Sequence, residues 1–266
     1  MRGRVLIVAG SDSGGGAGIQ ADIKTVTCLG GFAATAITAL TAQNTYGVAA
    51  VHEVPAAFVR QQIEMVLADI GADCIKTGML ASAAIVAAVA DAVEAGPDGV
   101  PLVVDPVMVA KGGASLLAAE ATRTLVARLV PRARLLTPNI PEAEALLGRS
   151  IHDVGDMEGA VRDLLALGAR AVLLKGGHLE GDELVDLLAD ADGVRRFAGR
   201  RIASRSTHGT GCTLASAIAA GLAQGLALDD AVLRARAYLI KAIATAPGLG
   251  GGHGPLNHGH TVGFSG

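Results

Sequence analysis

The sequence is poor in aromatic side chains and has no block of basic residues. Its 266 residues include no Trp, two Tyr and four Phe, and the formal net charge is -3 at pH 7. Proteins that bind nucleic acids usually combine a basic surface with aromatic rings on which bases stack. The composition supports no such surface, and we therefore expect no nucleic-acid partner.

Cysteines are also few. The three, Cys28, Cys74 and Cys212, are widely spaced and odd in number. A disulfide framework or a zinc knuckle would need cysteines in close pairs, so the pattern argues against both. A reducing compartment is the simpler interpretation.

Long apolar runs are absent as well. No apolar segment reaches the length of a membrane span without a glycine or a charged residue. The basic start is followed by the apolar run Val5–Ala9, but this run stops at Gly10, too early for a secretory signal peptide. We expect a cytoplasmic protein that does not associate with membranes.

Short apolar runs alternate with helix-like segments along almost the whole chain. The run Val5–Ala9 is continuous, as expected of a strand that is buried on both faces. Repeated units of this kind predict an α/β fold with a central, mostly parallel β-sheet flanked by helices on both faces. Residues 183–188 and 194–202 predict a small antiparallel β element. The length suits a single domain, 1–266, in which 248–266 form a Gly- and His-rich loop or frayed tail.

The expected elements can be given by residue. Further strands are expected at 33–40, 51–54, 74–76, 102–104, 135–136 and 171–174. Helices are expected at 17–29, 56–70, 82–95, 115–129, 142–147, 157–167, 213–222 and 229–244, with Ser82 as an N-cap.

Polar residues come directly after the apolar runs. In open α/β sheets, ligands bind beyond the carboxyl ends of the strands. A functional site is therefore expected at that edge of the sheet. The polar residues in question are Asp12, Gln43, Asn44, Lys76, Thr77, Asp105, Asn139 and Lys175.

The strongest local motif is Ser206–Cys212, which contains Gly209, Thr210 and Gly211 and leads into an Ala-rich helix. Glycines let backbone N–H groups point inward at a helix N-terminus, where partial positive charge favours anions. A thiol there should have a lowered pKa. Cys212 could then accept a proton from an alcohol while the N–H groups stabilise a transferring phosphoryl group. The alternative is a glycine turn capped by a small buried cysteine.

Two further motifs supply groups suited to a bound nucleotide. Asp105, Asn139 and Glu142 follow neighbouring strands, and hard oxygen ligands of this kind suit Mg²⁺. Asn139 and Glu142 equally fit a plain helix start, with Pro141 at the first helical position. Lys175, followed by two glycines, could approach phosphates or could simply belong to a strand-end turn.

The N-terminal glycine loop invites a dinucleotide interpretation, because Gly16, Gly18 and Ala21 fit a relaxed form of that fingerprint. The fingerprint also needs an acidic residue about twenty positions later, and no Asp or Glu lies between Asp22 and Glu53. A P-loop is excluded because the chain contains no Gly-Lys dipeptide. The loop fits better with a small substrate whose polar edge is read by Asp22 and Gln43.

Histidines gather near the C-terminus. His253, His258 and His260 could suggest a metal site, but they lack Cys or carboxylate partners in a Gly-rich segment. A solvated loop is the preferred interpretation.

Taken together, the motifs resemble one family. They are similar, in order, to those of the hydroxymethylpyrimidine/phosphomethylpyrimidine kinases of thiamin biosynthesis, within the ribokinase-like superfamily. The resemblance covers nearly the whole chain. It rests on Ala9–Asp22, Thr41–Asn44, Lys76–Met79, Val104–Met108, Thr137–Asn139 with Glu142, Lys175–His178, Gly209–Cys212 and Gly252–His258.

The resemblance implies roles for individual residues. It implies that Asp22, Gln43, Met79 and the loop at Gly10 line the pyrimidine pocket. Gly209, Thr210, Gly211 and Cys212 would form the anion hole, with Cys212 as the base. For Mg·ATP it implies Asp105, Asn139 and Glu142 around Mg²⁺, partly through water, and Lys175, Thr207 and Lys241 near ATP. It also implies a ribokinase-like kinase domain, a homodimer and two successive phosphoryl transfers, to the alcohol and then to its monophosphate.

Three other functions stay open at this point. The Gly-Thr-Gly-Cys motif is shared with a Cys-type pyridoxal kinase branch, whose substrate is also a flat heteroaromatic alcohol. An NAD-linked oxidoreductase rests on the N-terminal glycines alone. A non-catalytic pyrimidine-binding protein is disfavoured because Asp105, Glu142, Lys175 and Cys212 together form a complete phosphoryl-transfer set.

Overall fold

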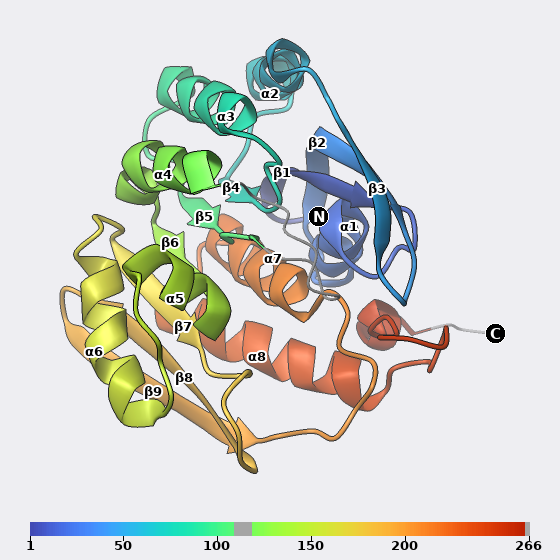
Figure 1. The fold of residues 1–266 in the computed structure, drawn as a ribbon. Coiled ribbons are helices and arrows are strands. Elements are labelled where there is room, and N and C mark those ends of the chain that lie inside the picture. The colour runs from blue at the N-terminus through green and yellow to red at the C-terminus, as the bar shows by residue number, and fades with distance from the viewer. Residues whose placement is uncertain (109–118, 264–266) are drawn as a thin grey trace.

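The computed structural model describes residues 1–108 and 119–263, in which nine strands form one sheet (Figure 1). The strand order is β3-β2-β1-β4-β5-β6-β7-β8-β9. Pairing is parallel from β2 to β7, whereas β3, β8 and β9 pair antiparallel with their neighbours. The strands are β1 (Arg4–Asp12), β2 (Phe32–Gln43), β3 (Val48–Glu53), β4 (Cys74–Thr77), β5 (Leu102–Val104), β6 (Leu135–Leu136), β7 (Ala171–Lys175), β8 (Glu183–Asp190) and β9 (Gly193–Arg200).

Helices cover both faces of the sheet (Figure 1). One face carries α2 (Ala56–Asp69), α3 (Ala83–Ala95), α4 (Ala119–Arg128), α5 (Ile140–Leu147) and α6 (Val154–Leu165). The other carries α1 (Gly18–Cys28), α7 (Thr210–Ala223) and α8 (Leu228–Ala244). The expected mostly parallel sheet with a small antiparallel element is confirmed. The first residues of the helix expected at 115–129 lie outside the described range.

Alternation along β1 explains why its sequence is apolar throughout. Leu6 and Val8 pack into the core beneath α2 to α6, whereas Val5, Ile7 and Ala9 pack into the core beneath α1, α7 and α8. Both faces of a central parallel strand are buried, so every position favours an aliphatic side chain. None of the helices among the described residues is long and apolar enough to cross a membrane.

The C-terminal segment is ordered against the body of the protein. Leu256 and His258 are buried, and a short 3-10 helix runs from His258 to Thr261. His258 Nε2 lies 3.0 Å from the hydroxyl of Thr213, and its carbonyl accepts a hydrogen bond from Tyr238. Burial lowers the pKa of His258 to about 4. The expectation of a solvated loop is therefore wrong for this histidine, because its ring is buried against Thr213 on α7.

Candidate active site

A cavity of about 290 Å³ opens at the carboxyl edge of the parallel strands. It lies between the loop after β1, the ends of β2, β4, β5, β6 and β7, and the N-terminus of α7. This is the edge at which the strand-end polar residues were expected to meet. Twelve of the predicted site residues line it: Gly10, Gln43, Met79, Asp105, Asn139, Glu142, Lys175, Thr207, Gly209, Thr210, Gly211 and Cys212.

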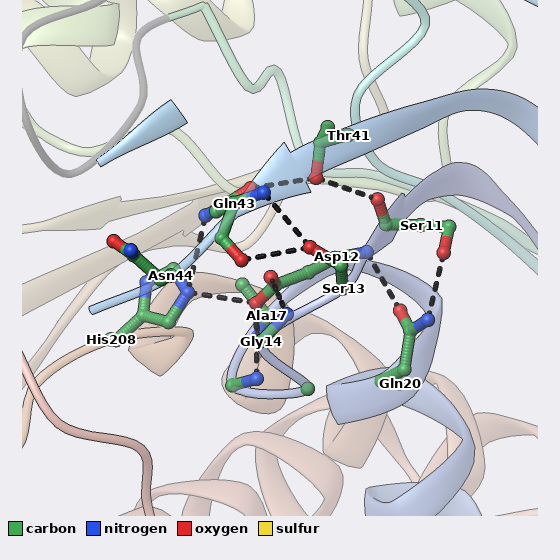
Figure 2. Close-up of polar contacts among 12 residues, drawn as sticks. Ser11, Asp12, Ser13, Gly14, Ala17, Gln20, Thr41, Gln43, Asn44 and His208 are labelled. Atoms are coloured by element: carbon green, nitrogen blue, oxygen red, sulfur yellow. Dashed lines mark hydrogen bonds and ion pairs between the residues drawn. The ribbon is translucent and has the colours of Figure 1, made fainter. Parts of the chain in front are cut away.

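The glycine loop after β1 is folded around the carboxylate of Asp12, as Figure 2 shows. Asp12 accepts hydrogen bonds from the backbone N–H groups of Gly14, Gly16 and Ala17 at 2.8 to 3.0 Å. The same carboxylate contacts Nε2 of His208 at 2.8 Å. Burial alone would raise the pKa of Asp12, but these hydrogen bonds outweigh it and lower the pKa. Asp12 is therefore the ionised centre of the loop.

Gly10 and Met79 form part of the cavity wall beside this loop. A side chain on Gly10 would collide with the terminal methyl group of Met79, so the two residues are in close contact. The wall that the resemblance assigned to the pyrimidine is thus made of the backbone of Gly10 and the thioether of Met79, and the thioether offers an apolar surface.

The residues predicted to form the anion hole, Gly209, Thr210 and Gly211, lie at the N-terminus of α7 and are called the cradle below. Gly209 is the N-cap and has φ +81°, a left-handed conformation that favours glycine. A side chain there would also collide with the carbonyl oxygen of Gly16, so the cradle and the first glycine loop touch backbone to backbone. At Gly211, an added Cβ would lie 3.4 Å from Nζ of Lys175 and 3.6 Å from Oδ2 of Asp105. The cradle is therefore open on the side that faces the Lys175 ammonium group and the Asp105 carboxylate.

Cys212 lies in the first turn of α7, but its thiol does not have the lowered pKa that the sequence suggested. Burial raises the pKa of the Cys212 thiol to about 12. The charge of Lys76 lowers this pKa, whereas the carboxylates of Asp22 and Asp105 raise it further. The expectation is wrong because it considered the helix terminus and not the depth of the thiol. Cys212 is a neutral thiol at neutral pH.

A buried ion pair lies behind the cavity. Nζ of Lys76, on β4, contacts both carboxylate oxygens of Asp22, on α1, at 2.8 and 2.9 Å. The hydroxyl of Ser216, on α7, donates to Asp22 at 2.6 Å. Burial alone would lower the pKa of Lys76, but the neighbouring negative groups outweigh it and raise the pKa, so the lysine is charged. The pair joins two helices to the central sheet.

Asp22 therefore does not lie where the resemblance implied. It is fully buried and is not among the residues that line the cavity, whereas its partner Lys76 is. Lys76 and Ser216 occupy its oxygens, which leaves the lysine as the group that this pair presents to the cavity.

Asp105 and Lys175 meet across the cavity floor from β5 and β7. Nζ of Lys175 contacts Oδ1 of Asp105 at 3.1 Å, and the hydroxyl of Thr137 donates to the same oxygen at 2.9 Å. Burial alone would lower the pKa of Lys175, but the carboxylates of Asp105 and Glu142 outweigh it and raise the pKa. A charged lysine thus stands 3.4 Å from the place of a Cβ on Gly211.

Asn139 and Glu142 form a reciprocal capping box at the start of α5. The side chain of Asn139 accepts from the N–H of Glu142 at 2.9 Å, and the carboxylate of Glu142 accepts from the N–H of Asn139 at 2.8 Å. The helix-start interpretation is confirmed. Burial, assisted by Asp105, raises the pKa of Glu142 to about 7 despite the nearby charge of Lys175.

The donor set fits a magnesium ion that keeps most of its water. No cluster of three His, Cys, Asp or Glu side chains converges within the described residues. Asp105 and Glu142 are close enough for each charge to act on the other, and Oδ2 of Asp105 lies on the side of Gly211. Mg²⁺ is typically held by one or two carboxylates, several waters and substrate phosphates. The oxygen of Asn139 is occupied by its cap.

A comparison with protein families agrees with this chemistry. Residues 12–257 match the family model described as phosphomethylpyrimidine kinase.

The chain belongs to the phosphomethylpyrimidine kinase family.

Relatives and a solved structure give the extent of the likeness. The chain is 56% identical over 257 residues to the thiamine biosynthesis bifunctional protein of Geobacter sulfurreducens, covering 97% of this chain but spanning only about half (52%) of that protein's length. It is 48% identical to the hydroxymethylpyrimidine/phosphomethylpyrimidine kinase of Rhizobium meliloti, covering 96% of each chain. The pyridoxal kinase of Staphylococcus aureus, solved with AMP-PCP and pyridoxal, superposes with a TM-score of 0.89 at 34% identity, covering 97% of this chain and 94% of that one. The ribokinase-like fold is confirmed.

Membership of this phosphomethylpyrimidine kinase family also argues against two of the three functions left open by the sequence. The oxidoreductase interpretation is wrong, because the matching family transfers phosphoryl groups. A non-catalytic binding protein is disfavoured on the same ground.

One predicted residue lies away from this kinase site. Lys241 is exposed on α8 and is not among the residues that line the cavity. Its place in the sequence indicated only a helix, and the direction of its side chain depends on how that helix packs against α7.

Lys76, Asp12 and His208 line the cavity, but none of them was assigned an individual role from the sequence. Lys76 and Asp12 were noted as strand-end groups, which was a usable signal. His208 stood inside the Ser206–Cys212 motif, but only the folded loops bring it to Asp12, 196 residues earlier.

The Lys76–Asp22 pair leads to a stability prediction. Replacing Lys76 by Met should lower the free energy of unfolding by about 3–5 kcal/mol, because it leaves an unpaired carboxylate in the interior. The double variant Lys76→Met, Asp22→Asn should recover most of that loss. Urea unfolding at pH 7 measures both. A loss below about 1 kcal/mol in the single variant would show that the pair is not the buried contact described.

Glu142 leads to a pH prediction. Because the pKa of Glu142 is raised to about 7 in the folded state, the folded protein holds this proton more tightly than the unfolded chain, whose value is about 4.3. Stability should therefore fall as pH rises from about 4.5 to 7. Glu142→Gln, which keeps the capping acceptor, should be more stable than the parent by about 2 kcal/mol at pH 8 and about equal at pH 4.5. Thermal unfolding of both proteins in the presence of a chelator, at pH 4.5 and at pH 8, measures the difference. An equal difference in melting temperature between variant and parent at the two pH values would contradict the prediction.

Proposed function

We propose that this chain transfers the terminal phosphoryl group of Mg·ATP to 4-amino-5-hydroxymethyl-2-methylpyrimidine, and then a second one to the monophosphate, in thiamin biosynthesis. The observation that carries the proposal concerns Gly211. The side of this residue where a Cβ would stand faces Lys175 and Asp105 at the edge of the cavity. A phosphoryl group at that point would meet backbone N–H groups on one side and a cation on the other. The names of the relatives support the substrate.

The residues of the cavity would have separate roles in an in-line displacement. Gln43, Gly10 and Met79 would hold the pyrimidine, while Lys175 and Thr207 would contact the phosphates of ATP. Gly209, Thr210 and Gly211 would stabilise negative charge on the transferring group, and Cys212 would take the proton of the alcohol. Catalysis by such a site comes mainly from positioning and from charge stabilisation.

Asp105 and Glu142 are the residues that would hold Mg²⁺, partly through water, with Asn139 setting the position of Glu142. The ion would supply charge neutralisation for the phosphates of the nucleotide. Lys175 contacts Asp105 of that site, and its ammonium group would itself bind the phosphates of the nucleotide.

An assay of ATP consumption tests the proposal. Hydroxymethylpyrimidine, its monophosphate and pyridoxal are compared at equal concentrations, and the products are identified by ³¹P NMR. We expect turnover with the first two. A clear preference for pyridoxal would overturn the pyrimidine assignment in favour of a pyridoxal kinase, the second candidate, which the likeness to the Staphylococcus aureus enzyme supports.

The proposal extends to assembly and location. Leu40 on β2 and Val51 on β3 are exposed by 47% and 44%, and Tyr46 between the two strands is exposed by 74%. A second copy that covered these side chains would remove them from water, and a homodimer is the assembly that the resemblance implies. Sedimentation of the parent and of Tyr46→Ser tests it.

A cytoplasmic location fits an enzyme that consumes ATP.

A further inference from the structure

Asp12, His208 and Gln43 form one hydrogen-bonded chain at the side of the cavity, drawn in Figure 2. Nε2 of His208 lies 2.8 Å from Oδ2 of Asp12 and 3.2 Å from the side-chain amide of Gln43. The three residues come from the end of β1, the end of β2 and the loop before α7. His208 is buried, and a side chain on Gly16 would collide with its ring, so the imidazole is tightly enclosed.

The proton on Nε2 can be placed from the partners of Asp12. Its carboxylate already accepts the N–H groups of Gly14, Gly16 and Ala17, and its pKa is lowered by these bonds and by His208 despite burial. An ionised carboxylate can only accept. Nε2 of His208 must therefore carry a hydrogen and donate it to Asp12.

The orientation of the Gln43 amide follows from that proton. The single hydrogen on Nε2 is shared, with Asp12 at 2.8 Å as the main acceptor and Gln43 at 3.2 Å as the second partner. An amino group of Gln43 would set a donor against this hydrogen, whereas the amide oxygen can accept the second, weaker branch of the bond. On the other side, the hydroxyl of Thr41 lies 2.9 Å from the carbonyl of Ser11 and 3.1 Å from the Gln43 amide. Its single proton goes to the Ser11 carbonyl, which can only accept, so it receives an N–H from Gln43. In the structure the amide nitrogen faces His208 and the amide oxygen faces Thr41. Both contacts are satisfied only when the amide is turned over, so that its oxygen faces His208 and its nitrogen faces Thr41.

We propose that His208 is a positioning residue that fixes the Gln43 amide in this orientation, so that its remaining N–H is held ready for a hydrogen-bond acceptor, such as a ring nitrogen, on the substrate. The proposal rests on the proposed function, since it specifies how the heteroaromatic alcohol is selected. Asp12 acts through His208. It accepts the hydrogen of His208 Nε2, which fixes the tautomer of the ring, and it also accepts backbone N–H groups of the glycine loop.

The first arm of the test needs no substrate. ¹⁵N NMR of the histidine side chains reports which ring nitrogen carries hydrogen, and the His208 signal is identified by its absence from His208→Gln. We expect a protonated Nε2 in the parent and a mixture of tautomers in Asp12→Asn. An Nε2 without hydrogen in the parent would overturn the proposal.

The second arm separates positioning from catalysis. His208→Ala should raise KM for the alcohol about tenfold, the scale of a lost hydrogen bond at a binding site, with kcat changed by less than about threefold and KM for ATP unchanged. His208→Gln, which places an amide nitrogen near the position of Nε2, should restore KM to within about threefold. A fall in kcat at constant KM would instead assign His208 to the phosphate cradle, and unchanged kinetics would remove its role.

A third variant tests the orientation itself. Gln43→Glu keeps an acceptor for His208 but has no N–H for the substrate, so it should raise KM at least as much as His208→Ala does. A KM equal to that of the parent would overturn the orientation. The kinetic arms use whichever alcohol the parent phosphorylates: a preference for pyridoxal would overturn the proposed function and leave these comparisons intact.

Discussion

Replacing Cys212 by alanine is expected to lower kcat by two to four orders of magnitude, with little change in KM for ATP. The thiol follows the N–H cradle in the first turn of α7 and lines the cavity. In the proposed function it takes the proton of the alcohol, and loss of a general base has effects of this size. Steady-state kinetics with a saturating alcohol measures the change. Near-normal turnover would show that Cys212 is not the base.

The raised pKa adds a pH signature to this prediction. Burial raises the pKa of Cys212 to about 12, so the thiolate fraction grows tenfold for each unit of pH through the neutral range. The kcat of the parent should therefore rise with pH. In Cys212→Asp the base would already be ionised, and the profile should be flatter. A parent profile that is flat from pH 6 to 9 would mean that the thiolate is not required.

Replacing Gly211 by alanine is expected to lower kcat/KM about a hundredfold without loss of stability. The new methyl group would lie 3.4 Å from Nζ of Lys175 and 3.6 Å from Oδ2 of Asp105, which are ordinary contact distances, so the fold can accept it. Alanine within a helix is also favoured over glycine by up to about 1 kcal/mol. The methyl group would, however, occupy the space into which the cradle opens, and the loss of one anion-hole contact has an effect of roughly this size.

A matched control separates this effect from a general change in the protein. Gly159 lies within α6, away from the cavity, and an added Cβ there would meet only the flexible end of Arg149. Gly159→Ala should have the kinetics of the parent and equal or greater thermal stability. Parent-like kcat/KM in Gly211→Ala would show that phosphoryl transfer does not take place against this turn.

Much of the fold could be predicted because its signals are local. The apolar runs of β1, β5 and β7 are short and uninterrupted, and buried parallel strands require that pattern. Their order in the sheet then brings the groups after them to one edge, which is why Asp105 and Lys175 could be expected near each other before any distance was known. The glycines of the cradle could be predicted for the same reason, because the turn that they allow depends only on the neighbouring residues of the chain.

The features that were missed depend on depth and on distant pairing. Asp22 was placed in the substrate pocket because it follows the glycine loop, but its partner Lys76 lies 54 residues away in the sequence. The thiol of Cys212 was assigned a lowered pKa from its helix terminus, while its burial and neighbouring carboxylates depend on the packing of α7 against the sheet. His258 looked solvated in a Gly-rich setting, and only the contact with Thr213 shows otherwise.

The C-terminal segment joins the two loops that carry the Gln43–His208 contact. His253 donates its N–H to the carbonyl of Thr45, beyond the end of β2, and the carbonyl of Gly254 accepts the N–H of His208. Two adjacent residues of this segment therefore act as a clasp between the loop after β2 and the loop before α7, which lie far apart in the sequence. The clasp consists of backbone hydrogen bonds, so it depends on the path of this segment and not on the identity of its side chains.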